Sequence, residues 1–273
     1  MIFMKPYLEL MRFGNCAMAA IAVLIGYTIV TLDFNIGTGL AMLSVFLICG
    51  GGQVINDVFD LEIDKKINKT KPIPSGKIKA NNATLFSGIL FLVGILIAFF
   101  INPLTFAIAI IFSFLLILYA SVLYRIKYLG NIIVAAGTAF TFIYGASVTG
   151  NIPALIIVFA ISAFFANMAR EITKDFQDLK KDKGFKKTMP MISKKLGKGF
   201  AISYHLLAIL FAIIAFIVFL PNNFVYLFFV LLATITFGRS IRLLLKNDFK
   251  QSQKGCKKGM LFSLLAYISA IIR

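Results

Sequence analysis

Acidic residues and cysteines are scarce in this chain of 273 residues. It contains eleven Asp and Glu against 28 Lys and Arg, giving a formal net charge of +17 at pH 7. Its three cysteines are scattered with no CxxC spacing, which argues against a cysteine-based metal or redox motif and favours small apolar side chains. The single histidine, His205, lies near the start of an apolar run, where a satisfied interfacial side chain is favoured over a ligand. Any metal binding or acid–base chemistry is therefore expected to involve the few carboxylates.

Apolar residues, in contrast, are abundant. They make up 60% of the chain and give a mean hydropathy of +0.91, which excludes a soluble domain of this length. Apolar runs of about eighteen residues or more recur, and each is long enough to span a hydrocarbon core of roughly 30 Å. We therefore predict an all-α polytopic membrane protein. Its nine transmembrane helices are expected near residues 13–32, 38–58, 83–102, 104–123, 130–149, 152–173, 199–220, 223–243 and 257–272.

The connections between the predicted spans alternate in charge. LDFNIGT, INPL, TGNIP and LPNN contain no Lys or Arg, whereas the other side of the chain holds every basic residue except Arg273. The positive-inside rule places the basic side in the cytoplasm, which predicts a multi-pass cell-membrane protein with a cytoplasmic N-terminus and an external C-terminus. The net charge is then a signal of topology. It requires no nucleic-acid partner, and it favours anionic lipid head groups.

Eight of the eleven acidic residues lie in two stretches, 56–78 and 170–190, each directly after an apolar run. Hard oxygen ligands on one helix face suit Mg²⁺, which prefers a few carboxylates plus substrate phosphate oxygens to an all-protein cage. We therefore interpret the two stretches as two halves of one metal-diphosphate site at the cytoplasmic mouth. Side chains at helical spacing in each stretch share a face: Asn56, Asp60 and Asp64 in the first, and Asp175, Asp178 and Asp182 in the second.

Basic side chains near the same mouth are expected to neutralise the remaining phosphate charge. The alternative is that the acids are ordinary loop charges balancing nearby lysines. That alternative is disfavoured because loop charges need not share a face or hold most of the acids of a chain. The candidate basic residues are Arg12, Lys71, Arg125, Lys127, Arg170 and Lys174.

An internal repeat relates the two halves of the chain. Two units of four helices, about 10–125 and 126–245, with a ninth helix appended, fit a single domain over residues 1–273. Repeats in membrane proteins often place a shared site at their interface. Three features recur at nearly one offset: Gly14-Asn15 at Gly130-Asn131 (116 residues), Asp60 and Asp64 at Asp178 and Asp182 (118), and Pro74 at Pro190 (116).

The two acidic stretches also match known motifs. NDVFDLEID fits NDxxDxxxD and DFQDLKKD fits DxxDxxxD, so the chain resembles the UbiA superfamily of intramembrane prenyltransferases over nearly its whole length. Further matches are the Arg12-Phe13-Gly14-Asn15 run, KPIPSGKI after the first motif, and Tyr119 with Lys127. The resemblance implies nine transmembrane helices around a central cavity, and Mg²⁺-dependent transfer of a prenyl group from its diphosphate to an acceptor.

The resemblance also implies roles for individual residues. The usual Arg-Pro after the first motif is Lys71-Pro72 here, which keeps the charge but loses the bidentate fork of arginine. The metal-diphosphate shells are expected to involve Asn56, Asp60, Asp64, Asp178 and Asp182. Substrate phosphates are expected to contact Arg12, Asn15, Lys71, Tyr119, Arg125, Lys127, Arg170 and Lys174.

The expected reaction begins with ionisation of the allylic C–O bond, as metal ions and lysines stabilise charge on the leaving diphosphate. A cavity walled by membrane helices keeps the carbocation from water until an acceptor attacks C1. Asp57 or Asp175 is the candidate base for an alcohol acceptor. The prenyl tail needs an apolar slot that some of the 29 Phe residues line, although most of them are expected to face lipid.

The acceptor is less sharply indicated. Without tryptophan and rich in Lys and Ile, the chain resembles the archaeal ether-lipid branch of the family, which moves geranylgeranyl from its diphosphate to the hydroxyl of geranylgeranylglyceryl phosphate. The alternative is polyprenyl transfer to 4-hydroxybenzoate or a naphthoate in quinone biosynthesis. A transporter is disfavoured because its acids would lie near the midplane of broken helices, not at helix ends on one side. No obligatory protein partner is indicated.

Overall fold

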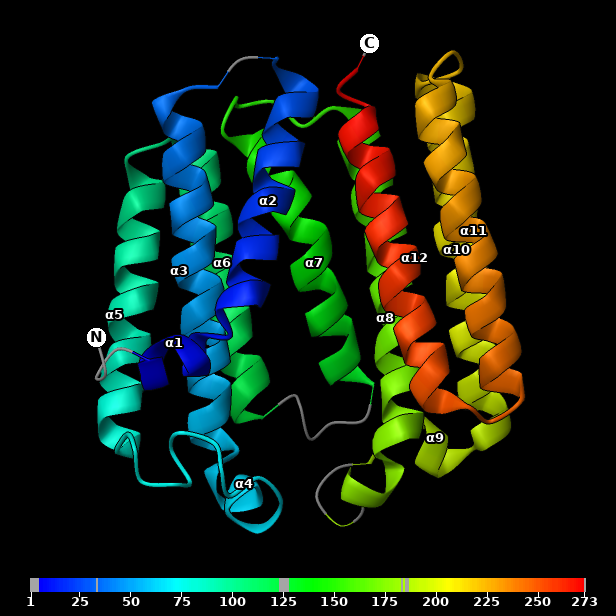
Figure 1. The fold of residues 1–273 in the computed structure, drawn as a ribbon. Coiled ribbons are helices and arrows are strands. Elements are labelled where there is room, and N and C mark those ends of the chain that lie inside the picture. The colour runs from blue at the N-terminus through cyan, green and yellow to red at the C-terminus, as the bar shows by residue number, and fades with distance from the viewer. Residues whose placement is uncertain (1–4, 33, 123–127, 183, 185–186, 273) are drawn as a thin grey trace.

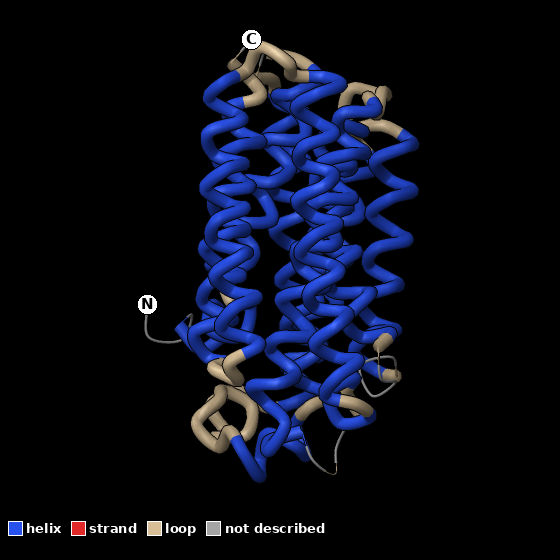
Figure 2. Tube along the Cα trace, turned by 90° about the vertical axis from the view of Figure 1, so that its right-hand side faces the viewer, coloured by secondary structure: helices blue, strands red, loops and turns tan. Residues whose placement is uncertain are grey.

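The computed structural model describes residues 5–32, 34–122, 128–182, 184 and 187–272, and this part of the chain is built from helices without strands. Figures 1 and 2 show the helices standing side by side in one bundle, joined by short loops at its two ends. Their bounds are α1 Lys5–Met11, α2 Phe13–Val30, α3 Ile36–Phe59, α4 Leu61–Ile67, α5 Ala80–Phe99, α6 Pro103–Ser121, α7 Leu129–Ser147, α8 Ala154–Asp182, α9 Met189–Ile192, α10 Lys194–Phe219, α11 Phe224–Leu245 and α12 Phe249–Ser269.

Eight of the described helices are long and apolar enough to cross a membrane: α2, α3, α5, α6, α7, α8, α10 and α11. The ninth predicted span, 257–272, overlaps most of α12, which ends at Ser269 and runs beside α11 and α8 along the bundle (Figure 1). Four lysines on its N-terminal half, Lys250, Lys254, Lys257 and Lys258, make α12 less apolar than the others. The structure thus confirms an all-helical multi-pass membrane protein, with the count of nine spans approximate.

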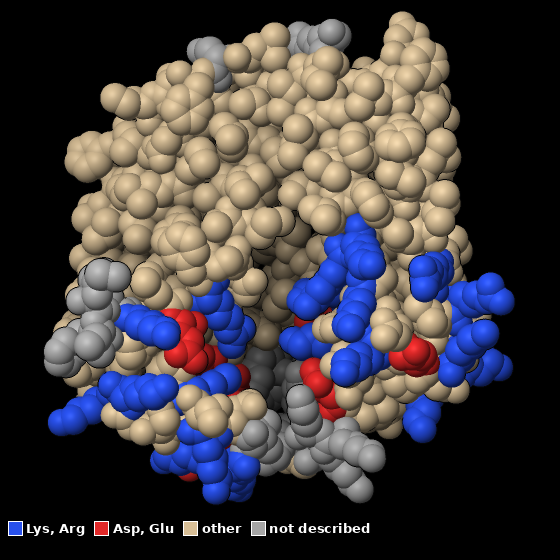
Figure 3. Space-filling view, viewed as in Figure 1, with Lys and Arg blue, Asp and Glu red and all other residues tan. Residues whose placement is uncertain are grey.

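The helices extend past their predicted spans mainly at the charged end. α8 continues to Asp182, well beyond the predicted 173, while α10 begins at Lys194 and α12 at Phe249, ahead of the predicted 199 and 257. Figure 3 shows Lys, Arg, Asp and Glu gathered at this one end of the visible face, with the rest of that face free of charge. The predicted alternation of connections therefore corresponds to the two ends of the bundle in Figure 1.

Glycines allow α2 and α7 to approach closely in the middle of the bundle. A Cβ built at Gly26 would lie 2.2 Å from the carbonyl oxygen of Phe142, and one at Gly145 would lie 2.1 Å from that of Val23. Small residues at membrane helix interfaces permit such contact and the dispersion energy that comes with it. This contact joins the first predicted repeat to the second, although the repeat itself stays a prediction.

Polar side chains within the spans connect neighbouring helices. The Tyr144 hydroxyl of α7 lies 2.7 Å from the Ser44 hydroxyl of α3, and Ser44 lies 2.7 Å from the Gly94 carbonyl oxygen, to which it donates. Asn102 caps α6 by accepting from the Thr105 amide, and its own amide donates to the Ser147 carbonyl. Through Ser44, Tyr144 is therefore part of a chain of hydrogen bonds that links α7, α3 and α5.

Candidate active site

The first acidic group lies where α3 ends and α4 begins. Asp57 and Asp64 are 4% and 3% exposed, so their charges need partners. Lys71, from the loop after α4, donates from Nζ to Asp57 Oδ1 at 3.0 Å and to Asp64 Oδ2 at 2.6 Å. Burial alone would lower the pKa of Lys71, but the two carboxylates outweigh burial and raise its pKa. The lysine that replaces the usual arginine is thus a cationic bridge between two buried acids.

Arg12 reaches the same group from a distant part of the chain. It stands between α1 and α2 with φ 51° and ψ 60°, a left-handed conformation that is uncommon for a residue with a Cβ. Its Nη2 donates to Asp57 Oδ1 at 3.0 Å across a separation of 45 residues. Unfavourable backbone conformations of this kind persist where the surroundings determine them, often at functional sites. The turn at Arg12 delivers its guanidinium to the end of α3.

Asn56, Asp60 and Asp64 stay on one side of the chain although α3 gives way to α4 at Asp60. Helical bonds continue through the junction, since the Asp60 amide donates to the Asn56 carbonyl and the Asp64 amide donates to the Asp60 carbonyl. Asn56 Nδ2 donates to Asp60 Oδ2 at 2.9 Å. Burial and then the charge of Asp64 raise the pKa of Asp60, and Lys71 only partly opposes this. Asp60 is thus a partly buried carboxylate next to another acid, and an additional cation would favour its ionised form.

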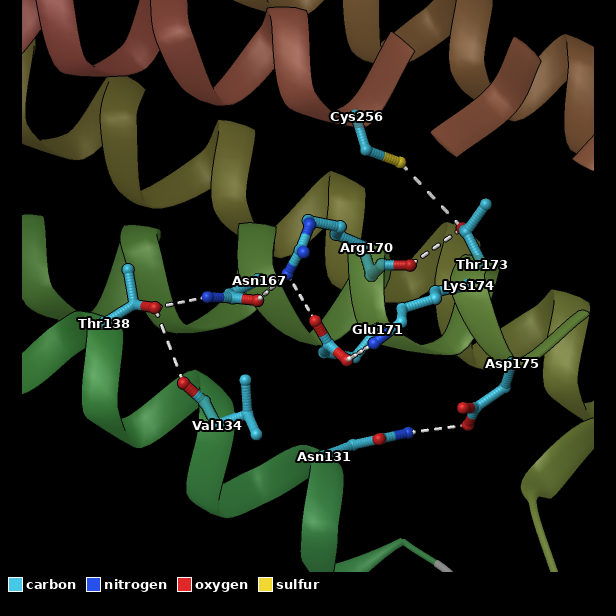
Figure 4. Close-up of polar contacts among 11 residues, drawn as sticks. Asn131, Val134, Thr138, Asn167, Arg170, Glu171, Thr173, Lys174, Asp175 and Cys256 are labelled. Atoms are coloured by element: carbon cyan, nitrogen blue, oxygen red, sulfur yellow. Dashed lines mark hydrogen bonds and ion pairs between the residues drawn. The ribbon is translucent and has the colours of Figure 1, made fainter. Parts of the chain in front are cut away.

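The second acidic group lies on α8 and is drawn in Figure 4. Glu171, a buried carboxylate, forms an ion pair with Arg170, and its Oε2 lies 3.8 Å from Lys174 Nζ. Arg170 Nη1 also donates to Asn167 Oδ1 at 3.2 Å, and Asn167 is hydrogen-bonded to Thr138 of α7. Glu171 thus holds two predicted phosphate-binding cations, a role that sequence reasoning did not assign to it. Its position in the sequence, between two basic residues one helical turn apart, could have predicted that Glu171 pairs with both of them.

Asp175 is buried on the same helix and accepts a hydrogen bond from α7. Asn131 Nδ2 donates to Asp175 Oδ2 at 2.9 Å, as Figure 4 shows. Sequence reasoning used Asn131 only as part of the repeat. Asn68 was also missed, and its Nδ2 donates to Asp64 Oδ1 at 2.9 Å. Both amides hold acids of the predicted site, but neither lies inside the matched motifs.

The remaining predicted residues divide between described and undescribed parts of the chain. Asp178 lies about one turn beyond Asp175 on α8 and is partly buried. Asn15 is exposed in the first turn of α2, three residues from Arg12. Arg125, Lys127 and the side chain of Asp182 lie outside the described residues.

The two acidic groups face each other across a cleft. Tyr119, partly buried near the end of α6, interacts electrostatically with Asp60 and Arg12 of the first group and with Glu171 and Asp175 of the second. Figure 3 shows a hollow in the charged end of the molecule, flanked on both sides by basic and acidic side chains. Stretches separated by more than a hundred residues in the sequence therefore border one site.

The donors at this site suit a hard cation. They are carboxylate and amide oxygens, and the described residues contain no group of three His, Cys, Asp or Glu side chains arranged as a metal cage. Mg²⁺ does not require such a cage, because it keeps waters and takes oxygens from a substrate phosphate. The partly buried carboxylate of Asp60, close to Asp64 and Asp57, is the feature of this structure that fits a divalent ion.

Known proteins resemble this chain along its whole length. The model of the UbiA prenyltransferase family matches residues 15–265. Digeranylgeranylglyceryl phosphate synthase from Methanococcoides burtonii is 41% identical over 97% of this chain and 99% of its own length. The synthase of the same name from Methanococcus aeolicus is 38% identical, covering 97% and 96%.

Solved structures show the same fold. The structure of a digeranylgeranylglyceryl phosphate synthase matches with a TM-score of 0.85 and 33% identity over 100% of both chains. A UbiA homologue from Archaeoglobus fulgidus, bound to GPP and Mg²⁺, matches with a TM-score of 0.70 and 20% identity over 95% of this chain and 99% of that one. With its family motifs placed around one cleft and matched over nearly the full chain, this protein belongs to the UbiA prenyltransferase family.

Proposed function

We propose that this protein transfers a geranylgeranyl group from geranylgeranyl diphosphate to the free hydroxyl of geranylgeranylglyceryl phosphate, in the synthesis of archaeal membrane ether lipids. The observation that carries the proposal is the pair of acidic and basic groups, from α3–α4 and α8, that border one cleft beside Tyr119. The full-length similarity to digeranylgeranylglyceryl phosphate synthases favours this acceptor over an aromatic acid.

We assign the Mg²⁺ ligands to both sides of the cleft. On the first side these are the oxygens of Asn56, Asp60 and Asp64, and on the second we assign Asp178 with Asp182. When bound, Mg²⁺ would neutralise the diphosphate and stabilise the charge that develops as it leaves. The homologue from Archaeoglobus fulgidus bound to GPP and Mg²⁺ supports this cofactor for the fold.

We assign four basic side chains to the binding of substrate phosphates. Arg12 and Lys71 are held by Asp57, and Arg170 and Lys174 are held by Glu171. Each cation is therefore fixed at the mouth before substrate arrives, which reduces the reorganisation that the transition state requires. Arginine adds paired N–H donors with a geometry that matches phosphate oxygens.

The reaction also needs a dry path and a proton acceptor. The cleft lies among membrane helices, so their apolar side chains shield the allylic cation from water until the acceptor hydroxyl attacks C1. Oδ1 of Asp57 already accepts hydrogen bonds from Arg12 and Lys71, which suits it to holding cations. We therefore assign the proton of the acceptor hydroxyl to Asp175, whose orientation Asn131 fixes.

The charged end of the bundle is proposed to face the cytoplasm. Both acidic groups lie at this end, and the loops that join the helices there carry the Lys and Arg residues. By the positive-inside rule the active-site mouth and the N-terminus are then cytoplasmic, and the C-terminus is outside.

A transfer assay on purified protein in detergent tests the proposal. It contains Mg²⁺ and geranylgeranyl diphosphate, with geranylgeranylglyceryl phosphate and 4-hydroxybenzoate offered in separate reactions. We expect prenylated product with the glyceryl phosphate alone. Product only with the aromatic acid would contradict the proposed acceptor and indicate a prenyltransferase of quinone biosynthesis. Product with neither acceptor would refute prenyl transfer to both.

A further inference from the structure

A second charged feature lies at the same end of the bundle but on α11. Arg239, Arg242 and Lys246 line a shallow, open recess on the surface of α11, together with Gly238 and Leu243. The three basic residues are spaced i, i+3 and i+7, so they lie on one face of the helix. A Cβ at Gly238 would meet nothing within 4 Å, so the helix surface beside these cations is open.

This recess has little local negative charge. Arg239, Arg242 and Lys246 are exposed, and the ion pairs found within the described part of the chain involve other residues. Asp248 is the only acid in the sequence after Asp182, and its Oδ1 accepts a hydrogen bond from the Gln251 amide at the start of α12. The positive field of the recess is therefore available to an external anion.

An apolar stripe continues from the recess along the same face of α11. Phe224, Phe228, Leu231 and Ile235 follow the i, i+4, i+7 and i+11 spacing, and each is more than half exposed. Extending the spacing reaches Arg239, Arg242 and Lys246. Since α11 is a candidate membrane span that packs chiefly against α12 and α10, this face is turned toward lipid, away from α3 and α6 of the catalytic cleft.

We propose that this face of α11 is a binding site for an anionic lipid. The phosphate head group occupies the recess among the three basic side chains, and the hydrocarbon chains lie along the apolar stripe. Two arginines three residues apart supply paired N–H donors for phosphate oxygens, an arrangement stronger and more directional than lysine alone. A free phosphate would use only the recess, whereas the continuous stripe indicates a ligand with both a head group and tails. The proposal does not depend on the acceptor assigned above.

Native mass spectrometry of the full chain in detergent tests this site. Purified protein is titrated with phosphatidylglycerol or with phosphatidylcholine of the same acyl chains, and bound lipids are counted. The test variant is Arg239→Gln with Arg242→Gln, and the matched control is Lys194→Gln with Lys195→Gln, which removes two exposed charges from the same end of the bundle. We expect the test variant to bind phosphatidylglycerol about thirtyfold more weakly, with the control unchanged.

Further measurements distinguish a lipid head group from a free phosphate, and a defined binding site from diffuse electrostatic attraction. Soluble glycerol 1-phosphate at the same concentration is expected not to displace the lipid, and phosphatidylglycerol is expected to raise the melting temperature of the wild type but not of the test variant. Equal loss of binding in both variants would overturn the proposal in favour of diffuse attraction. Equal binding of phosphatidylcholine would reduce the site to an apolar surface, and displacement by glycerol 1-phosphate would reduce it to a phosphate site.

Discussion

Replacing Lys71 by methionine should destabilise the protein, because two buried carboxylates lose the cation that lies between them. The substitution keeps an apolar stem of similar length but removes the cation that lies 3.0 Å from Asp57 and 2.6 Å from Asp64. Loss of one partner from a buried ion pair costs about 3–5 kcal/mol of unfolding free energy. Because Asp57 keeps Arg12 and Asp64 keeps Asn68, we expect the lower end, about 3 kcal/mol.

The pH dependence of this loss follows from the charges. The pKa of Lys71 is raised above the ordinary lysine value of 10.5, so its stabilisation is fully present below that pH and disappears only as the pH rises through the raised pKa. Lys71 also opposes the rise in the pKa of Asp60 that burial and the charge of Asp64 cause. In Lys71→Met the pKa of Asp60 should rise further, so its ionised form destabilises the fold more, and protonating Asp60 in acid removes that cost. The difference between wild type and variant should therefore shrink as the pH falls from 8 toward 4.

Chemical or thermal unfolding in detergent, followed by circular dichroism at several pH values, measures the effect. Lys65→Met is the matched control, because Lys65 pairs at the surface with Glu62, which is fully exposed, and its loss should leave stability unchanged. Lys71→Arg should recover most of the loss, since it restores the cation. Equal stability of Lys71→Met and Lys65→Met at pH 8, or a difference independent of pH, would refute the reasoning.

Three further predictions follow from the packing and the site. Asp60→Ala and Asp178→Ala should each abolish turnover in the transfer assay while the helical content by circular dichroism is kept; near-normal turnover by both with Mg²⁺ present would contradict the two-sided site. Asn131→Ala should lower kcat about tenfold, because it removes a hydrogen bond that orients the Asp175 carboxylate, and an unchanged kcat would remove Asn131 from a positioning role. Gly145→Ala should lower the unfolding free energy by about 1–3 kcal/mol, because the added methyl group forces α2 away from α7. Gly137→Ala is the control and should leave the unfolding free energy unchanged, because a Cβ there meets its nearest neighbour at 3.7 Å.

Much of the fold could be predicted because its signals are local in sequence. Apolar runs identify the spans, and eight of them are recovered as helices long and apolar enough for a membrane. The alternation of basic connections predicts which helix ends lie together. The spacing of Asn56, Asp60 and Asp64 predicts a shared side, and helical hydrogen bonds through the α3–α4 junction keep it. The span predicted over α12 begins eight residues after the helix does, because the lysines in its N-terminal half interrupt the apolar run, and it ends three residues beyond Ser269.

What the tertiary structure decided is which charges meet. Nothing near Arg12 in the sequence indicates its left-handed backbone or its contact with Asp57, 45 residues away. Lys71 as a bridge and Glu171 as the holder of two cations depend on burial, which turns nearby charges into obligatory partners. The approach of α2 to α7 depends on Gly145 facing Val23 across a helix pair. Composition and periodicity act along one helix, whereas these contacts depend on how separate helices pack, and that geometry places both acidic groups on one cleft.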